Sequence, residues 1–206
     1  MSTDDKLLYL SRPDIESLGL TAADTVAQIE HLCRERDAAR VLNAPKSLLR
    51  PVDDVLFMAT LAVSEDPPFM AVKALGANAA NAHKGMTTIG STITLFDRAT
   101  AYPVAIMDGA WITEIRTAAL SAVAARHFAR KDSETIAFIG SGAQARSHLD
   151  AFLDFCPLRH VRIFGRGDNH VSFTHMDNIA HGLLCGANAL RPGAEGVFQG
   201  SPVRVN

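Results

Sequence analysis

The most distinctive stretch of the chain is a glycine loop between a short apolar run and a segment with helical character. Gly140 and Gly142 lie in this loop, and Ala145 stands at the third small position of a GxGxxA pattern. A pyrophosphate group needs backbone N–H groups at a helix N-terminus, with no side chain in its way. With a strand before it and a helix and strand after it, the pattern favours a dinucleotide-binding turn. The alternative is a tight strand-to-helix turn that binds no ligand.

The end of the next expected strand bears on the choice of dinucleotide. An acidic residue there binds the ribose 2′-hydroxyl, whereas an arginine can hold a 2′-phosphate. The chain has Arg166 at this place, which slightly favours NADP(H). Asp168 would favour NAD(H) if the strand ended two residues later, and Arg166 could instead be a solvated surface charge.

Three basic residues stand in settings where solubility does not require them. Lys46 follows a proline, Lys73 interrupts the apolar run "FMAVKALG", and Arg116 lies in the segment "TEIRTAA". An arginine on an apolar helix face commonly binds a carboxylate through two N–H groups. A lysine within a strand is costly unless it faces a partner or water. These residues predict a carboxylate site; the alternatives are a lysine that reaches solvent from an edge strand and an internal ion pair of Arg116.

Length and composition allow a sizeable core and argue against several classes of function. The chain has 206 residues, of which 48% are hydrophobic, enough for one large domain or two small ones. A formal net charge of -2 gives no basic field for nucleic acid. We expect no membrane span and no secretory signal, because long apolar runs are absent. Three separated cysteines without a CxxC pair predict a reduced, cytoplasmic location and no metal site.

The first part of the chain predicts a helix followed by a mostly antiparallel sheet. Thr21 and Asp24 form an expected capping pair for a helix over residues 22–39. An alanine-rich segment predicts a second helix over 113–130, with Thr113 as its N-cap. Apolar runs rich in β-branched residues predict strands over 54–62, 69–76, 90–97 and 103–108.

The remainder of the chain has a different organisation. A polar break at 131–134 predicts a boundary between a domain of residues 1–130 and one of residues 131–206. A strand at 135–139, a helix at 143–155 and a strand at 160–164 predict one β-α-β unit. The expected fold class is therefore α/β, with an α+β substrate-binding and dimerisation domain followed by an incomplete Rossmann-type domain.

Together these motifs resemble the ornithine cyclodeaminase/mu-crystallin family. The block "MDGAWITEIRTAA" at 107–119, followed about twenty residues later by "IGSGAQ", is the most specific part, and the resemblance runs from about residue 7 to 166. It implies an NAD(P)-dependent oxidoreductase, ornithine cyclodeaminase-like or ketimine reductase-like, that acts on a small amino or imino acid as a homodimer. The alternative is a non-catalytic, mu-crystallin-like dimer that binds NADP(H).

The resemblance also implies roles for single residues. It places Lys73 against the substrate and Arg116 between the substrate carboxylate and the cofactor. Thr88 matches a threonine near the cofactor phosphates or nicotinamide. Ala143 and Gln144 match an Ala-Gln pair under the pyrophosphate, next to the two loop glycines.

Two departures from the family pattern affect these expectations. Lys46 stands where many members have an arginine, so the charge is kept but the planar two-pronged geometry is lost. Beyond Arg166 we find neither the family's further strands nor its later catalytic aspartate. This departure predicts a truncated gene product, a fusion or a frameshifted reading frame. Residues 171–190 instead resemble a segment of extended short-chain dehydrogenases of the 3β-hydroxysteroid type. The Tyr-xxx-Lys pair of that family is absent, so we expect no steroid chemistry. An alternative interpretation is that the chain is a fragment of a short-chain dehydrogenase, and the missing pair argues against it. The tail histidines His170, His175 and His181 predict no metal site, because no carboxylate or cysteine pattern joins them.

Overall fold

The computed structural model describes residues 6–164, 195–198 and 201–204. The chain divides into two compact units, Met1–Gly167 and Asp168–Asn206. In the second unit, strands β10 (Glu195–Phe198) and β11 (Ser201–Arg204) pair in antiparallel fashion. Arg166 and the tail segment at 171–190 lie outside the described residues. The domain boundary expected after residue 130 falls within the first unit and stays a prediction.

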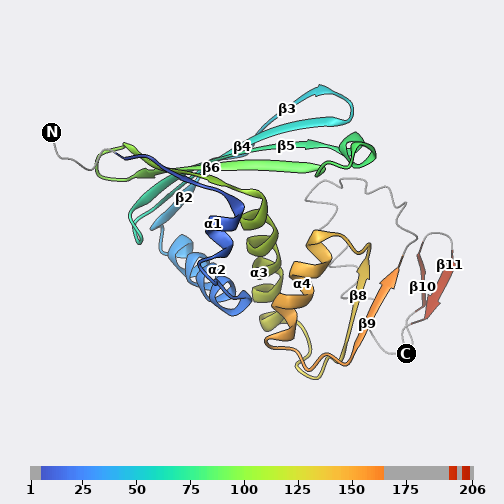
Figure 1. Cartoon of the computed structure of the whole chain (residues 1–206). Coiled ribbons are helices and arrows are strands. Elements are labelled where there is room, and N and C mark those ends of the chain that lie inside the picture. The colour runs from blue at the N-terminus through green and yellow to red at the C-terminus, as the bar shows by residue number, and fades with distance from the viewer. Residues whose placement is uncertain (1–5, 165–194, 199–200, 205–206) are drawn as a thin grey trace. The chain divides into compact units, whose positions relative to one another are not determined.

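A seven-stranded sheet forms much of the first unit (Figure 1). Its strand order is β1-β7-β6-β5-β4-β2, and β3 pairs with β4 beside this path. All pairs are antiparallel except β1 with β7. The strands are β1 (Leu8–Leu10), β2 (Val41–Asn43), β3 (Ser47–Val52), β4 (Val55–Ser64), β5 (Phe69–Asn78), β6 (Ile89–Asp97) and β7 (Pro103–Asp108). The four predicted strands and the mostly antiparallel sheet are confirmed.

Helices α1 (Arg12–Glu16), α2 (Ala22–Asp37) and α3 (Ala110–Phe128) lie on one face of this sheet (Figure 1). The predicted capping pair is present, because Thr21 and Asp24 exchange side-chain and backbone hydrogen bonds at the start of α2. The 3₁₀ helix η1 (Ala79–Lys84) follows β5 directly.

The predicted N-cap of α3 is wrong. The helix begins at Ala110, directly after the last strand of the sheet, and Gly109 is its N-cap residue. Thr113 lies inside the first turn, where its hydroxyl donates to the carbonyl of Gly109 at 2.5 Å. A threonine hydroxyl can satisfy a carbonyl four residues earlier as readily as it caps a helix start, so residue type alone did not distinguish the two.

Small residues allow two other helices to pack closely against α3. Ala118, Ala119 and Ala122 of α3 are buried against Val26 of α2 and Ala151 of the fourth helix. Alanine side chains leave room for close backbone approach, so the alanine-rich segment becomes the centre of the helical core. In the described part of the chain, no helix is long and apolar enough to cross a membrane.

The predicted β-α-β unit is confirmed. Strand β8 (Thr135–Ile139) pairs in parallel with β9 (His160–Phe164), and helix α4 (Ala143–Leu153) connects them. Helix α4 packs along α3 (Figure 1). This packing connects the glycine loop, at the start of α4, to the helices that cover the sheet.

Candidate functional site

The glycine loop has the geometry that an anion requires. Gly140 has a φ of +95°, a conformation that a side chain would strain, and Gly142 is the N-cap residue of α4. A Cβ at either glycine would meet no atom within 4 Å, so the approach to the backbone is open. No side chain caps α4, which leaves the N–H groups of its first turn available. The loop therefore fits a phosphate-bearing group held by backbone N–H groups.

A cavity of about 540 Å³ adjoins the start of α4. Its walls come from the turn between α1 and α2, the segment before β6, the first turns of α3 and one side of α4. The lining residues are Arg12, Leu20, Thr21, Ala22, Thr87, Trp111, Glu114, Ile115, Ala143, Arg146, Ser147, Asp150 and Ala151. Thr87 and Ile115 thus share one cavity with Ala143, and they are the chain neighbours of Thr88 and Arg116.

Lys73 lies in the middle of β5 and reaches toward helix α3. Its Nζ donates to Thr113 Oγ1 at 2.5 Å, and the side chain is half-buried. Burial, together with the positive charges of Arg116 and Lys46, lowers the pKa of Lys73 to about 8. The structure therefore brings together the three cations that the sequence singles out.

These cations have no acidic partner in the described part of the chain. Neither Lys73, Arg116 nor Lys46 forms an ion pair there, although nine other pairs are present. Burial lowers the pKa of Arg116, yet its side chain keeps an exposed surface, as does that of Lys46. Positive groups that are partly desolvated and unpaired form a favourable site for an anion.

Two further predicted residues, Thr88 and Gln144, are exposed. Thr88 accepts a backbone hydrogen bond from Asn78 at 2.9 Å, while its neighbour Thr87 is the one that lines the cavity. The carbonyl of Gln144 lies 2.6 Å from Nδ1 of His148. Since a carbonyl can only accept, Nδ1 is the donor in this bond.

His148 also links the glycine-loop helix to α3. Its Nε2 lies 3.0 Å from the hydroxyl of Ser121, in the middle of α3. Helix α4 is therefore tied to α3 by a polar contact as well as by apolar packing. The sequence gives no signal for this contact, because Ser121 and His148 are 27 residues apart.

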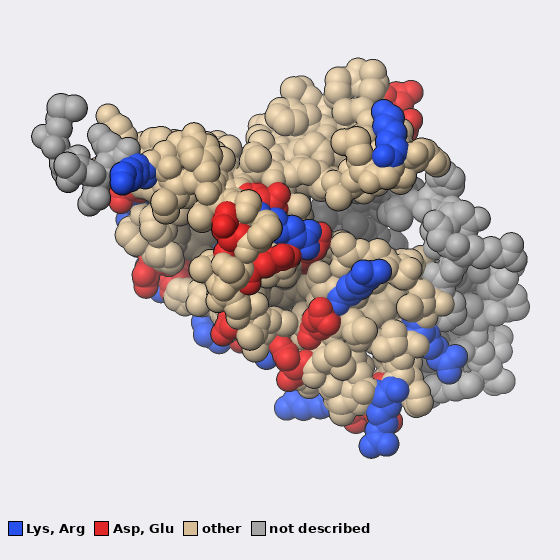
Figure 2. Space-filling model, in the orientation of Figure 1, with Lys and Arg blue, Asp and Glu red and all other residues tan. Residues whose placement is uncertain are grey.

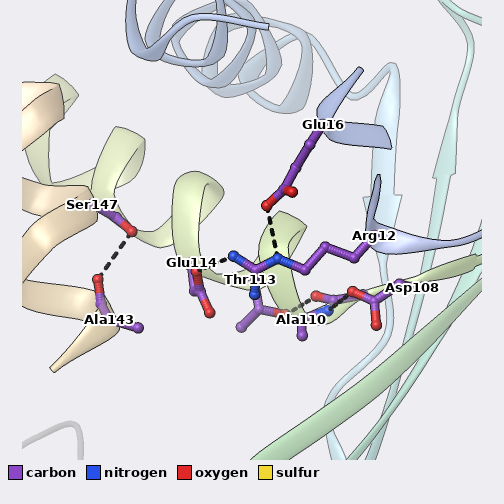
Figure 3. Close-up of polar contacts among 9 residues, drawn as sticks. Arg12, Glu16, Asp108, Ala110, Thr113, Glu114, Ala143 and Ser147 are labelled. Carbon is purple, nitrogen blue, oxygen red and sulfur yellow. Dashed lines mark hydrogen bonds and ion pairs between the residues drawn. The ribbon is translucent and has the colours of Figure 1, made fainter. Parts of the chain in front are cut away.

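The rim of the cavity carries an ionic network that the sequence does not predict. Arg12 pairs with Glu16 at 2.7 Å and with Glu114 at 3.5 Å (Figure 3). The hydrogen bond that Arg12 donates to Glu16 is the main cause of the raised pKa of Arg12. At the opposite wall, the Ser147 hydroxyl donates to the carbonyl of Ala143 at 3.1 Å (Figure 3). Arg12 begins a five-residue helix, too short for a periodic pattern.

Charges of both signs are interspersed over the described surface shown in Figure 2. Acidic and basic side chains alternate there, without one extended area of either sign on this face. Among the described residues, no group of three or more His, Cys, Asp or Glu side chains is placed to hold a metal ion.

The described fold combines a mostly antiparallel sheet and its helices with a β-α-β unit that carries a glycine loop, as in Rossmann-like proteins. The chain belongs to the ornithine cyclodeaminase/mu-crystallin family, whose model matches residues 6–178. That match extends past Arg166, where the similarity visible in the motifs ended.

Similar proteins support this assignment. The chain is 30% identical over 163 residues to the nodulation efficiency protein NfeD of Rhizobium meliloti, which covers 79% of this chain and 51% of that protein. The structure of Thermococcus litoralis Δ1-pyrroline-2-carboxylate reductase with NADH and L-proline aligns with a TM-score of 0.74 and 29% identity, over 78% of this chain and 50% of that one. An archaeal alanine dehydrogenase dimer with bound NAD aligns with a TM-score of 0.71 and 27% identity, over 76% and 48%. The chain thus spans about half the length of these relatives.

Proposed function

We propose that the chain is an NAD(P)-dependent oxidoreductase, ornithine cyclodeaminase-like or ketimine reductase-like, that acts on a small amino or imino acid. The observation that carries this proposal is the group formed by Lys73, Arg116 and Lys46, which has no acidic partner in the described residues. An α-carboxylate would supply that partner. The structure of the pyrroline-2-carboxylate reductase contains NADH and L-proline, and that of the alanine dehydrogenase contains NAD. These ligands support the proposed cofactor and substrate class.

The residues divide the work between two halves of the site. The open loop at Gly140 and Gly142 and the first N–H groups of α4, at Ala143 and Gln144, would hold the pyrophosphate. When bound, the nicotinamide cofactor accepts or donates a hydride. Arg116 would bind and orient the carboxylate of the substrate.

Lys73 would add a second charge and a titratable proton to this site. A pKa of about 8 lets Nζ hold or release a proton near neutral pH. The family resemblance assigns Thr88 a contact with the cofactor, although Thr87 is the threonine that lines the cavity with Ala143. Lys46 would contribute charge without the planar geometry of an arginine.

Cofactor binding can be measured through the chain's single tryptophan. Trp111 lines the cavity beside Ala143, so bound NADH or NADPH is expected to quench its emission by energy transfer. Titration of each cofactor gives both dissociation constants. The preference for NADP(H) stays a prediction, based on Arg166. Absence of quenching and of calorimetric heat at about millimolar cofactor, a very weak affinity, would contradict the proposal.

A non-catalytic, mu-crystallin-like binding protein is the second candidate. Among the described side chains, no carboxylate pairs with Lys73 or Arg116. The described site therefore has no acidic group that could share proton transfer with these two residues, which favours a binding function. Steady-state assays with L-ornithine, and with a cyclic imine plus NADPH, separate the candidates. Turnover above a Lys73→Met control eliminates the binding-only function, and cofactor binding without turnover supports it.

We also propose that the chain forms a homodimer through the sheet. Side chains alternate across a strand, so Phe57 and Leu61 of β4 lie on the face opposite Thr60, which pairs with Lys73 on the helix side. Leu49 of β3 pairs with Phe57 and extends this exposed apolar area. Light scattering after size exclusion tests the dimer, and Phe57→Lys should shift it toward monomer.

Two finer expectations belong with this proposal. A cytoplasmic location is supported by the free thiols of Cys33 and Cys156, and localisation of a tagged chain tests it. The similarity of residues 171–190 to short-chain dehydrogenases carries no activity in the proposal, because that family's Tyr-xxx-Lys pair is absent from the chain.

A further inference from the structure

Thr113 is the side chain that holds the amine of Lys73. The Nζ atom of Lys73 donates to Thr113 Oγ1 at 2.5 Å, across 40 residues of sequence. Thr113 is one of two buried polar or charged residues among those described, whereas Lys73 is only partly buried. The contact therefore joins a partly exposed lysine to the hydroxyl of a buried side chain.

The hydrogen-bond inventory of Thr113 fixes the direction of this contact. A threonine hydroxyl has one proton and two acceptor positions. The proton is committed to the carbonyl of Gly109 at 2.5 Å, because that carbonyl can only accept. The oxygen must then accept from Lys73, and its second acceptor position faces the hydroxyl of Ser91 at 3.3 Å. This arrangement offers an acceptor to an ammonium group.

Close packing of α3 against β6 holds Thr113 in position. The N–H of Gly109 donates to the carbonyl of Ser91 at 2.8 Å. A Cβ on Gly109 would lie 2.7 Å from Ser91 Oγ and 3.2 Å from the backbone carbon of Ser91. The glycine is therefore needed for the strand and the helix start to approach this closely, which sets the place of Thr113 relative to β5.

We propose that Thr113 is a positioning residue for Lys73. It uses one N–H of the ammonium and leaves the other two for the carboxylate of the substrate. This inference rests on the proposed function, because the substrate is what the two remaining N–H groups would bind. The charged groups that face Lys73 are Arg116 on α3 and Lys46 before β3, both of which disfavour the ammonium. The hydroxyl of Thr113 is a contact that favours it.

Competitive labelling of lysines tests the inference without substrate or cofactor. The full chain is treated with trace acetic anhydride over a range of pH, and the acetylated fraction of the Lys73 peptide is measured by mass spectrometry. Thr113→Val removes the acceptor and should lower the labelling midpoint of Lys73 by roughly half a pH unit to one unit. Thr113→Ser keeps the hydroxyl and should restore the midpoint.

A matched control lies one turn further along the same helix. Thr117 donates to the carbonyl of Thr113 at 2.6 Å and has no hydrogen bond with Lys73, so Thr117→Val should leave the midpoint unchanged. If circular dichroism shows that Thr113→Val is unfolded, Thr113→Ala is used, with the same expected shift. An unchanged midpoint in a folded Thr113 variant without the hydroxyl overturns the inference. Failure of the proposed function would appear separately, as loss of cofactor quenching in the wild-type chain.

Discussion

Replacing Lys73 by methionine should stabilise the fold at neutral pH while weakening the site. The pKa of Lys73 falls from 10.5 to about 8 in the folded chain, mainly through burial. Each pH unit corresponds to about 1.4 kcal/mol, so an unscreened charge would cost about 3 kcal/mol. The side chain is only half-buried, and solvent screening reduces the expected gain to roughly 1–2 kcal/mol. Methionine keeps the volume and removes the charge.

The stability difference between Lys73→Met and the wild type should depend on pH. Below about pH 8 the lysine is protonated in both states, and the folded state bears the full cost of the charge. Between about pH 8 and 10.5 the folded state releases the proton first, so the wild-type chain gains stability as pH rises. The advantage of Lys73→Met is therefore largest at neutral pH and shrinks through this interval.

Urea unfolding followed by far-UV circular dichroism measures the effect. Free energies of unfolding are compared at about pH 7 and about pH 10 for the wild type and Lys73→Met, with equal m-values as the condition for comparison. Lys84→Met, at an exposed lysine, controls for loss of a surface charge. A variant that is less stable than wild type at neutral pH, or a difference that does not change with pH, would refute the reasoning.

Three other substitutions have defined outcomes. Gly109→Ala places a Cβ 2.7 Å from Ser91 Oγ, so the free energy of unfolding measured in urea should fall by about 1–3 kcal/mol. Gly76→Ala is the control, because a Cβ there has no neighbour within 4 Å and should lack this overpacking cost. Gly142→Val adds bulk in front of the α4 N–H groups and should raise the NADH dissociation constant at least roughly tenfold in the tryptophan titration. This change corresponds to a loss of about 1.4 kcal/mol of binding free energy. Equal affinity would argue against the loop as the pyrophosphate site. Thr21→Ala removes the capping box of α2 and should cost about 1 kcal/mol by thermal or urea unfolding; an unchanged stability would show that the cap is not formed.

Long elements of the fold were predictable because their patterns are repeated over many residues. The four long strands and the β-α-β unit carry continuous apolar runs, and the start of α2 carries a capping pair with a local mechanism. The three strands β1, β2 and β3 were not predicted. Two of them have three residues each, and β3 contains Arg50 and Pro51. Such segments become strands through pairing with neighbours, which no local pattern shows.

The site was predictable in its charges and its backbone but not in its contacts. Lys73 and Arg116 stand out because a charge in an apolar segment is costly, and that cost is local to the sequence. The hydrogen bond from Lys73 to Thr113 depends on the packing of α3 against the sheet, so it emerges only in three dimensions. A threonine is typical both of a helix N-cap and of a first helical turn with a side-chain hydrogen bond to the backbone. Residue type alone therefore did not predict the contact of Thr113 with the lysine.

The central claim is that the cations of the first half and the glycine loop form one site. Its most direct measurement is the NADH dissociation constant, from Trp111 energy transfer, with and without L-proline and other small amino and imino acids at saturating concentration. At least one of these carboxylates should tighten NADH binding. Arg116→Gln should remove the effect, while NADH alone still binds. NADH binding that no carboxylate alters, or a tightening that survives in Arg116→Gln, would contradict the central claim.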